Sequence, residues 1–295
     1  MELRRFLVIL TISVVTILAV VVWLFPPNED FDADNPFWNG TKDTSSIMLA
    51  SPLESLSDLP LFPGGSTLIL IPYLGFAPTE LEDIHSFVTL GGTLVLADDY
   101  GHGNQVLEYL GLQVRFSGHS LLDPWVCHVN HWFPKIPHIT ASSITANIES
   151  LVLNHATCLI DVETSDVLAL SSVFSFLDLN DNESWDEVEP GGPLPVISHH
   201  NLGSGKIILI SDPSIFINTM SQFENNLTFI QNIAAVTASE VFIDQSHLPT
   251  SNLRPTKNLL AAIRDSLTTP VGAVTLVIVA LSITLVPIWY RRRQY

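Results

Sequence analysis

The chain has 295 residues, 47% of them hydrophobic, and a formal net charge of −18 at pH 7. Five of its 12 basic residues flank the two apolar ends and only Glu2 of its 30 acidic residues lies outside the middle, so the middle carries −22. A charge of this sign repels nucleic acid and attracts cations, which excludes nucleic-acid binding.

The first apolar segment covers residues 6–25, which contain no charged residue and follow Arg4 and Arg5. About 20 apolar residues in a helix are enough to cross a bilayer core of about 30 Å. Short basic flanks stay on the cytoplasmic side. We therefore predict that residues 1–26 are a transmembrane anchor. A cleaved signal peptide is less well supported, because Val20–Phe25 offers no small-residue cleavage site.

A polar stretch at 27–44 is expected to be a linker, and residues 45–245 are expected to form one α/β domain. Within that domain, short apolar runs typical of buried strands alternate with amphipathic stretches typical of helices. The expected elements are a strand at 67–72, a helix from 78 to about 90, a strand at 93–97, a helix at 105–110, strands at 167–177, 194–198 and 206–211, a helix at 224–236 and a strand at 241–243. This alternation predicts a parallel sheet covered by helices.

A second linker is expected at 246–268, before another apolar segment. Residues 270–290 contain no charge and are followed by Arg291, Arg292 and Arg293. We predict a second transmembrane helix at 269–290 and a cytoplasmic tail at 291–295. With two spans in the cell membrane, both termini would be cytoplasmic, the main domain would lie outside, and the lipid bilayer would be one binding partner.

Three sequence blocks carry a resemblance to a known family: Leu90–Asp99, Leu110–Leu112 and Gly203–Ser214. They resemble an uncharacterised prokaryotic family of membrane-anchored domains similar to class I glutamine amidotransferases, catalogued as domain of unknown function 4350. The resemblance covers roughly residues 37–236. It implies a flavodoxin-like, amidotransferase-like parallel sheet with helices on both faces. It also implies membrane-protein partners, among them a MoxR-type ATPase system and von Willebrand-type or transglutaminase-like proteins.

Amidotransferases of this fold place a nucleophilic Cys on a tight strand-to-helix turn, where a nearby His activates it. Here the strand at 93–97 leads into Asp98, Asp99, Tyr100, Gly101 and His102, with neither a Cys nor a G-x-S-x-G motif. We therefore expect no amidotransferase activity and no catalytic residue. A hydrolytic or metal site of Asp98, Asp99 and His102 at the strand end is the alternative. A polar turn that caps the next helix is the favoured interpretation.

The segment 178–189 has the ligand spacing of a calcium loop. The expected ligands are the side chains of Asp178, Asn180, Asn182, Asp186 and Glu189, with the backbone carbonyl of Ser184. Glu183 stands where the pattern has Gly, and the flanks are typical of strands, so the loop would join strands. We predict a weak Ca²⁺ site with a Kd of about 10⁻⁴–10⁻³ M. The alternative is a solvated acidic loop.

Histidines and cysteines give weaker signals. His128 and His131, near His119, Asp123 and His138, would share a face only on a helix, and nearby prolines argue against one. We interpret these residues, and likewise His199 and His200, as surface or core histidines. Cys127 and Cys158 leave open both a disulfide and two free thiols.

Taken together, the sequence favours a non-catalytic interaction or scaffold module, stabilised by Ca²⁺ and working with membrane partners. Two alternatives stay open. One is an extracytoplasmic hydrolase that uses Asp98, Asp99 and His102, and the other is an auxiliary subunit of a transporter-like membrane complex. A cleft shared by Asp98 and His102 would favour the enzyme, whereas carboxylates that cap backbone groups would favour the module.

Overall fold

The computed structural model describes residues 2–24 and 26–249, and isolated positions between 259 and 278. The chain divides into a compact unit, Pro27–Pro249, and a unit that combines Met1–Pro26 with Thr250–Tyr295. We call the first unit the α/β domain. The stretch expected to be a linker, 27–44, belongs to this domain, because Phe31 and Ala33 are buried in its core.

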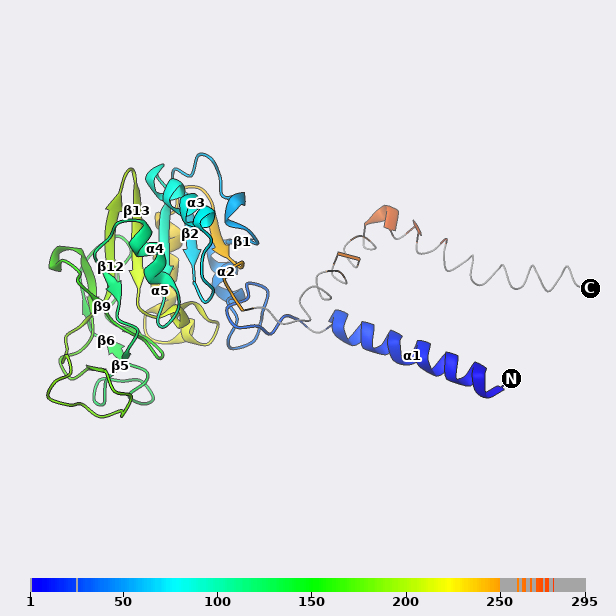
Figure 1. The fold of residues 1–295 in the computed structure, drawn as a ribbon, viewed down its shortest axis with the longest axis horizontal. Coiled ribbons are helices and arrows are strands. Elements are labelled where there is room, and N and C mark those ends of the chain that lie inside the picture. The colour runs from blue at the N-terminus through cyan, green and yellow to red at the C-terminus, as the bar shows by residue number, and fades with distance from the viewer. Residues whose placement is uncertain are drawn as a thin grey trace, which may run out of the picture. The chain divides into compact units, whose positions relative to one another are not determined.

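The α/β domain is built on an eight-stranded sheet with the strand order β1-β14-β2-β3-β13-β12-β10-β7 (Figure 1). The strands are β1 (Ser51–Leu53), β14 (Val241–Asp244), β2 (Thr67–Leu70), β3 (Thr93–Ala97), β13 (Gly205–Ile210), β12 (Pro195–Leu202), β10 (Val167–Leu170) and β7 (His138–Ile139). The five from β1 to β13 pair in parallel. The pairs β13–β12, β12–β10 and β10–β7 are antiparallel.

The predicted all-parallel sheet is therefore corrected to a mixed one. The reason is the connection between β12 and β13, which is a tight hairpin that pairs Leu202 with Gly205. A two-residue connection joins only antiparallel strands, because a parallel neighbour needs a long crossover. The predicted strand at 167–177 also breaks in two, at Ser171–Ser175, into β10 and the separate β11 (Phe176–Asp178).

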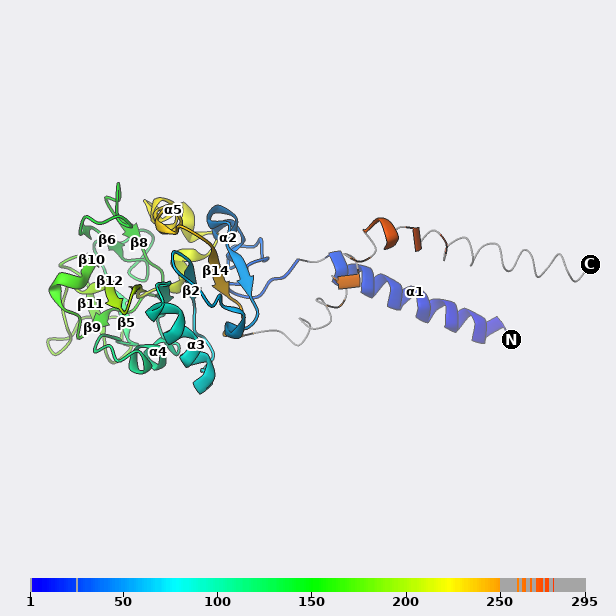
Figure 2. The ribbon, with the colours of Figure 1, turned by 90° about the horizontal axis from the view of Figure 1, so that it is seen from above.

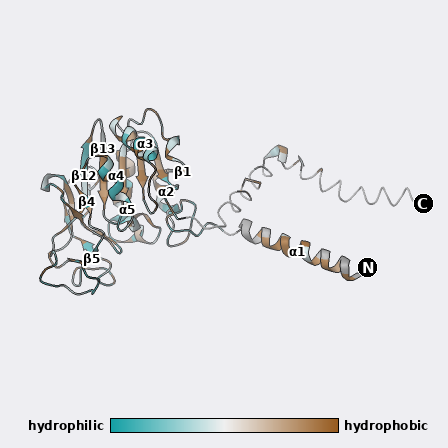
Figure 3. Ribbon diagram, viewed as in Figure 1, coloured by the Kyte–Doolittle hydropathy of each residue, from teal (hydrophilic) through white to brown (hydrophobic). Residues whose placement is uncertain are grey.

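Helices cover both faces of the sheet (Figure 2). They are α2 (Lys42–Met48), α3 (Pro78–Thr89), α4 (Gly103–Tyr109) and α5 (Asn226–Val236). Side chains of α3 and α4 share one apolar cluster with Leu94 and Leu96, and side chains of α2 and α5 share the other with Val95. Successive residues of β3 thus point to opposite cores, which explains why β3 has no polar side (Figure 3).

Short elements fill the region 115–178, within which the sequence predicted no strand or helix at 115–164. The two-stranded pairs are β5 (Ser120–Leu122) with β11, β4 (Arg115–Phe116) with β9 (Leu159–Ile160), and β6 (Lys135–Ile136) with β8 (Leu151–Val152). Four 3₁₀ turns complete the described elements of the domain: η1 (Leu56–Asp58), η2 (Thr164–Asp166), η3 (Pro213–Phe216) and η4 (Met220–Gln222).

The two transmembrane helices of the predicted fold class are not supported. Residues of the first predicted span form α1 (Glu2–Leu24). Across the described residues, however, no helix combines the length and the apolar character that a bilayer crossing requires. An uncharged stretch indicates a span only if it also forms such a helix, and counting residues in the sequence does not test that condition. The second predicted span, 269–290, lies largely outside the described residues. The location outside the cell followed from these spans and stays untested.

The start of α5 generates a test of the fold. The amide of Asn226 is buried, donates to the carbonyls of Val152 and Met220 and accepts from the amide N–H of Val152. We expect Asn226→Leu to lower the free energy of unfolding by about 2–4 kcal/mol, because buried backbone groups lose their partners. Urea unfolding measures the change. Gln231→Leu, at an exposed position of the same helix, is the control and should change it by less than about 0.5 kcal/mol.

Candidate functional site

The carboxyl end of β3 is the place where the sequence predicted a polar turn or a catalytic cluster. Asp98, directly after β3, is only 3% exposed. Its Oδ1 accepts from the backbone N–H groups of Asp99 (3.0 Å) and Gly101 (2.8 Å). Its Oδ2 accepts from the N–H of Gly103 (2.7 Å), the first residue of α4. The side chain therefore organises the whole turn from β3 into α4.

Two glycines enclose this carboxylate. A Cβ atom on Gly101 would lie 2.6 Å from Oδ1 of Asp98, and a Cβ on Gly103 would lie 2.6 Å from Oδ2. Both separations are shorter than any ordinary contact, so only glycine fits at either position. The Asp98 carboxylate is thus surrounded by backbone on both sides, which leaves no room for a substrate against it.

The three residues of the hypothetical hydrolytic site do not act together. Asp99 turns its Oδ1 to the N–H of Tyr100 (2.6 Å). His102 precedes α4, and its backbone N–H donates to the carbonyl of Pro72 (2.8 Å). No hydrogen bond or ion pair joins the side chains of Asp98, Asp99 and His102 in the part of the chain that the structure describes. The carboxylates cap backbone groups, as the favoured interpretation of the sequence expected.

The sequence analysis missed a further aspartate at this edge. Asp212 follows β13 and is buried, and it accepts from the N–H groups of Asn154 (2.6 Å) and Ser214 (2.7 Å). Its signal was present in the block Gly203–Ser214, where Asp212 follows an apolar strand just as Asp98 does. Since β3 and β13 are parallel neighbours, both carboxyl groups lie at the same edge of the sheet.

Burial dominates the protonation of these groups. It raises the pKa of Asp98 to about 7 although three N–H donors oppose the shift, and it raises the pKa of Asp212 to about 8. Burial also raises the pKa of Asp99. It raises the pKa of Tyr73 as well, and the negative charges of Asp99 and Asp212 add to that shift. The edge therefore holds carboxyl groups that gain protons near neutral pH, yet each of them is occupied with backbone N–H groups.

The predicted calcium loop follows β11 and is held by its own acidic side chains. Asp178 is buried and accepts from the N–H groups of Asn180, Asn182 and Glu183. Glu189 accepts from the N–H groups of Leu179 (2.8 Å) and Asp186 (3.0 Å) and so closes the loop.

The middle of this loop has the backbone shape of a tight turn. Asp181 and Glu183 adopt positive φ angles of 59° and 58°, so the sharp turn forms at Glu183 without the expected Gly. The side-chain amides of Asn180 and Asn182 both donate to Oδ2 of Asp186, at 2.8 and 3.0 Å. No three His, Cys, Asp or Glu side chains converge as a metal site within the described residues. Ser184 contributes its N–H to Asn182.

The side chains of the histidine-rich segment make separate contacts. His131 pairs with Glu183 of the acidic loop (3.0 Å), whereas the ring of His128 packs against Phe223. Cys127 and Cys158 are both free thiols, and burial raises the pKa of Cys158 to about 12. The interpretation of these residues as core and surface groups agrees with this geometry.

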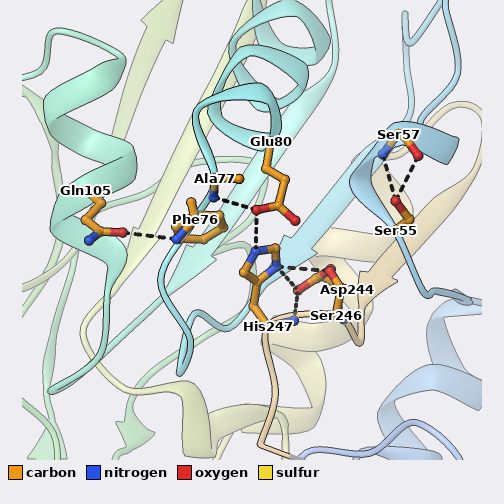
Figure 4. Close-up of polar contacts among 9 residues, drawn as sticks. All are labelled: Ser55, Ser57, Phe76, Ala77, Glu80, Gln105, Asp244, Ser246 and His247. Atoms are coloured by element: carbon orange, nitrogen blue, oxygen red, sulfur yellow. Dashed lines mark hydrogen bonds and ion pairs between the residues drawn. The ribbon is translucent and has the colours of Figure 1, made fainter.

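A buried histidine ties the end of β14 to the start of α3 (Figure 4). Nδ1 of His247 lies 2.9 Å from Asp244, and Nε2 lies 3.5 Å from Glu80. Glu80 also accepts from the N–H of Ala77, at the start of α3. Burial lowers the pKa of His247, but the hydrogen bond and charge of Asp244, together with Glu80, more than offset this, so the pKa is raised. The cluster is a structural clamp filled by protein groups.

Three solved structures are similar to part of this chain. The mmIFT52 N-terminal domain is 14% identical over 58% of this chain and 77% of that chain, with a TM-score of 0.44. A β-galactosidase from Bacillus circulans sp. alkalophilus is 14% identical over 58% of this chain and 22% of that chain, with a TM-score of 0.35. A ThuA-like protein from Bacteroides uniformis is 14% identical over 68% and 77%, with a TM-score of 0.36. Likenesses this distant carry no argument about function.

No curated protein matches the chain. One family model does match, over residues 33–234. This range includes the β3–α4 turn and every strand of the eight-stranded sheet except β14. The chain therefore belongs to the family described as a domain of unknown function (DUF4350).

Proposed function

We propose that the α/β domain is a non-catalytic interaction module whose amidotransferase-like fold carries a structural aspartate where a nucleophile would stand. The observation that carries the proposal is the Asp98 carboxylate, which is bound by three backbone N–H groups and enclosed by Gly101 and Gly103. A nucleophile or general base has to reach a substrate atom. The Asp98 carboxylate instead accepts hydrogen bonds from the backbone of the turn.

An interaction role is also supported by large apolar side chains on the surface of the region 115–195. Trp125 is 78% exposed, Trp185 57% and Phe174 55%. The loops that carry Trp125 and Phe174 lie together, because Asp123 accepts from the N–H of Trp125 and from the hydroxyl of Ser172. Exposed aromatic residues are enriched where proteins bind partners. The partner proposed from the family resemblance is a MoxR-type ATPase system.

Calcium binding by the loop 178–189 is proposed as a stabilising feature of this module. It is supported by the closeness of Asn180 and Asn182 to Asp186, whose carboxylate accepts from both amide nitrogens, and by the turn geometry at Asp181 and Glu183. Ca²⁺ takes carboxylate, amide and backbone oxygens together, so the amides of Asn180 and Asn182 count as ligands. The loop is also stable without an ion, since its acidic side chains accept backbone N–H groups.

The structural role of Asp98 predicts that its removal causes a large loss of stability. Asp98→Ala should lower the free energy of unfolding by about 3 kcal/mol or more, because three buried N–H groups lose a charged acceptor. Urea unfolding measures this effect. His102→Ala, which removes the only imidazole of the turn, should leave stability within about 0.5 kcal/mol.

The same variants test the absence of catalysis. Wild type and His102→Ala should both give background rates on nitrophenyl ester, phosphate and glycoside substrates and on a peptide amide. A rate above background that disappears in His102→Ala, with unfolding unchanged, would establish the hydrolase and end the module proposal.

Calcium should stabilise the wild-type protein against heat. At a Kd of about 10⁻⁴ M, millimolar Ca²⁺ adds about 1–2 kcal/mol relative to a chelator. Asp186→Asn removes a ligand charge but no backbone hydrogen bond, so it should lose most of this gain in Tm. Asp181→Asn removes an equal charge from a non-ligand position of the same loop and should keep it. Equal responses from the two variants would reduce the effect to charge screening and contradict the site.

Burial of Asp212 makes stability depend on pH. Its pKa is about 8 in the folded protein and 3.8 ordinarily, so between these values the folded state binds more protons than the unfolded chain. The free energy of unfolding therefore falls as pH rises through this window. From pH 5 to pH 8, the free energy of unfolding should fall for wild type by at least about 1 kcal/mol more than for Asp212→Asn, since an amide does not titrate. Equal losses in urea unfolding would mean that Asp212 stays ionised throughout.

A further inference from the structure

A cavity of about 280 Å³ opens beside the β12–β13 hairpin, away from the β3–α4 turn and the acidic loop. Its apolar wall consists of Ile144, Leu168 and Ile208. Its polar wall contains His199, Asn201 and Lys206, together with two serines of the loop 142–143. An apolar wall facing a few polar groups is the usual composition of a small-molecule site.

Strand register builds this cavity. His199 pairs with Ile208 and Asn201 pairs with Lys206, so these four residues share one face of the hairpin. The same face continues into the core that α5 covers. Asn232 of α5 donates to the carbonyls of Ile144 (3.2 Å) and Ala146 (2.8 Å) and so holds the covering loop in place. The walls are therefore fixed before any ligand arrives.

Lys206 is an unusual residue in this domain. Residues 27–249 contain only four Lys and Arg residues. Arg115 donates to backbone carbonyls, and Lys135 pairs with Glu224. Lys206 has no ion pair or side-chain hydrogen bond among the described residues, and no acidic residue lines its cavity. In a domain so rich in Asp and Glu, the cavity therefore offers an ammonium group without a competing carboxylate.

His199 adds a second donor. Its Nδ1 is buried and has no hydrogen-bond partner in the described part of the chain. A proton on Nδ1 would be a buried N–H without an acceptor, which is costly. The neutral ring therefore carries its proton on Nε2 and can donate from there. Beside Lys206, this arrangement offers two donors to a ligand oxygen.

We propose that this cavity binds a small organic carboxylate, with the carboxylate at Lys206 and His199 and a compact apolar body against Ile144, Leu168 and Ile208. At about 280 Å³, the cavity has room for a ligand the size of benzoate. Such binding goes beyond an interaction role, and it stands on residues that the interaction proposal does not use.

The test compares benzoate with benzamide, a neutral molecule of the same shape, on the full-length chain by calorimetric titration. Wild type should bind benzoate at least tenfold more tightly than benzamide. Lys206→Met keeps the aliphatic stem and removes the charge, so it should weaken benzoate binding at least tenfold and abolish the preference. Lys42→Met removes an exposed lysine of α2 outside the cavity and should change the Kd by less than twofold.

Two further measurements locate the binding. Benzoate should shift the methyl resonances of Ile144, Leu168 and Ile208, and Ser143→Phe, which fills the mouth of the cavity, should prevent binding. Equal affinity for benzoate and benzamide, equal effects of the two lysine variants, or no benzoate binding by folded wild type would each overturn the proposal. A hydrolase result at His102 would remove the interaction module and leave these outcomes unchanged.

Discussion

The hydrogen bonds of Asp98 are the constraint on which the centre of the domain depends. β3 is an inner strand of the parallel half, with β2 on one side and β13 on the other. The chain must turn sharply at its end to place α4 over the sheet. A single buried carboxylate holds this turn through three N–H groups, and the glycines at 101 and 103 allow the close approach. The carboxylate at this strand end therefore stabilises the turn into α4.

Buried aspartates hold other turns of the domain in the same way, so some of its acidic residues have a structural role. Asp98, Asp123, Asp178, Asp212 and Asp244 are all buried, and each accepts N–H groups from residues that follow it closely in the chain. Short carboxylates that bind their own backbone stabilise irregular turns. Five of the acidic residues thus hold loops at strand ends.

The sequence predicted four strands of the parallel half, β2, β3, β13 and β14, because they contain apolar runs, as at 67–70 and 93–97. It did not predict β1, in which only Leu53 is buried. It did not predict that the other strands pair in antiparallel orientation, because an apolar run gives no information on the direction of the neighbouring strand. It also predicted the turn after β3 and favoured a capping role for Asp98. It missed Asp212, because Asp212 and Asp98 come to the same edge of the sheet only through the pairing of β3 with β13, two strands distant in the chain.

The clamp around His247 holds the last residues of the α/β domain against the start of α3. His247 lies two residues before Pro249, the last residue of the unit, and its imidazole bridges Asp244 and Glu80. Its carbonyl also accepts from the N–H of Leu74. Because the two carboxylates raise the pKa of His247, the ring keeps its proton to a higher pH than an ordinary histidine does. The C-terminal end of the domain is therefore held more firmly below this pKa than above it.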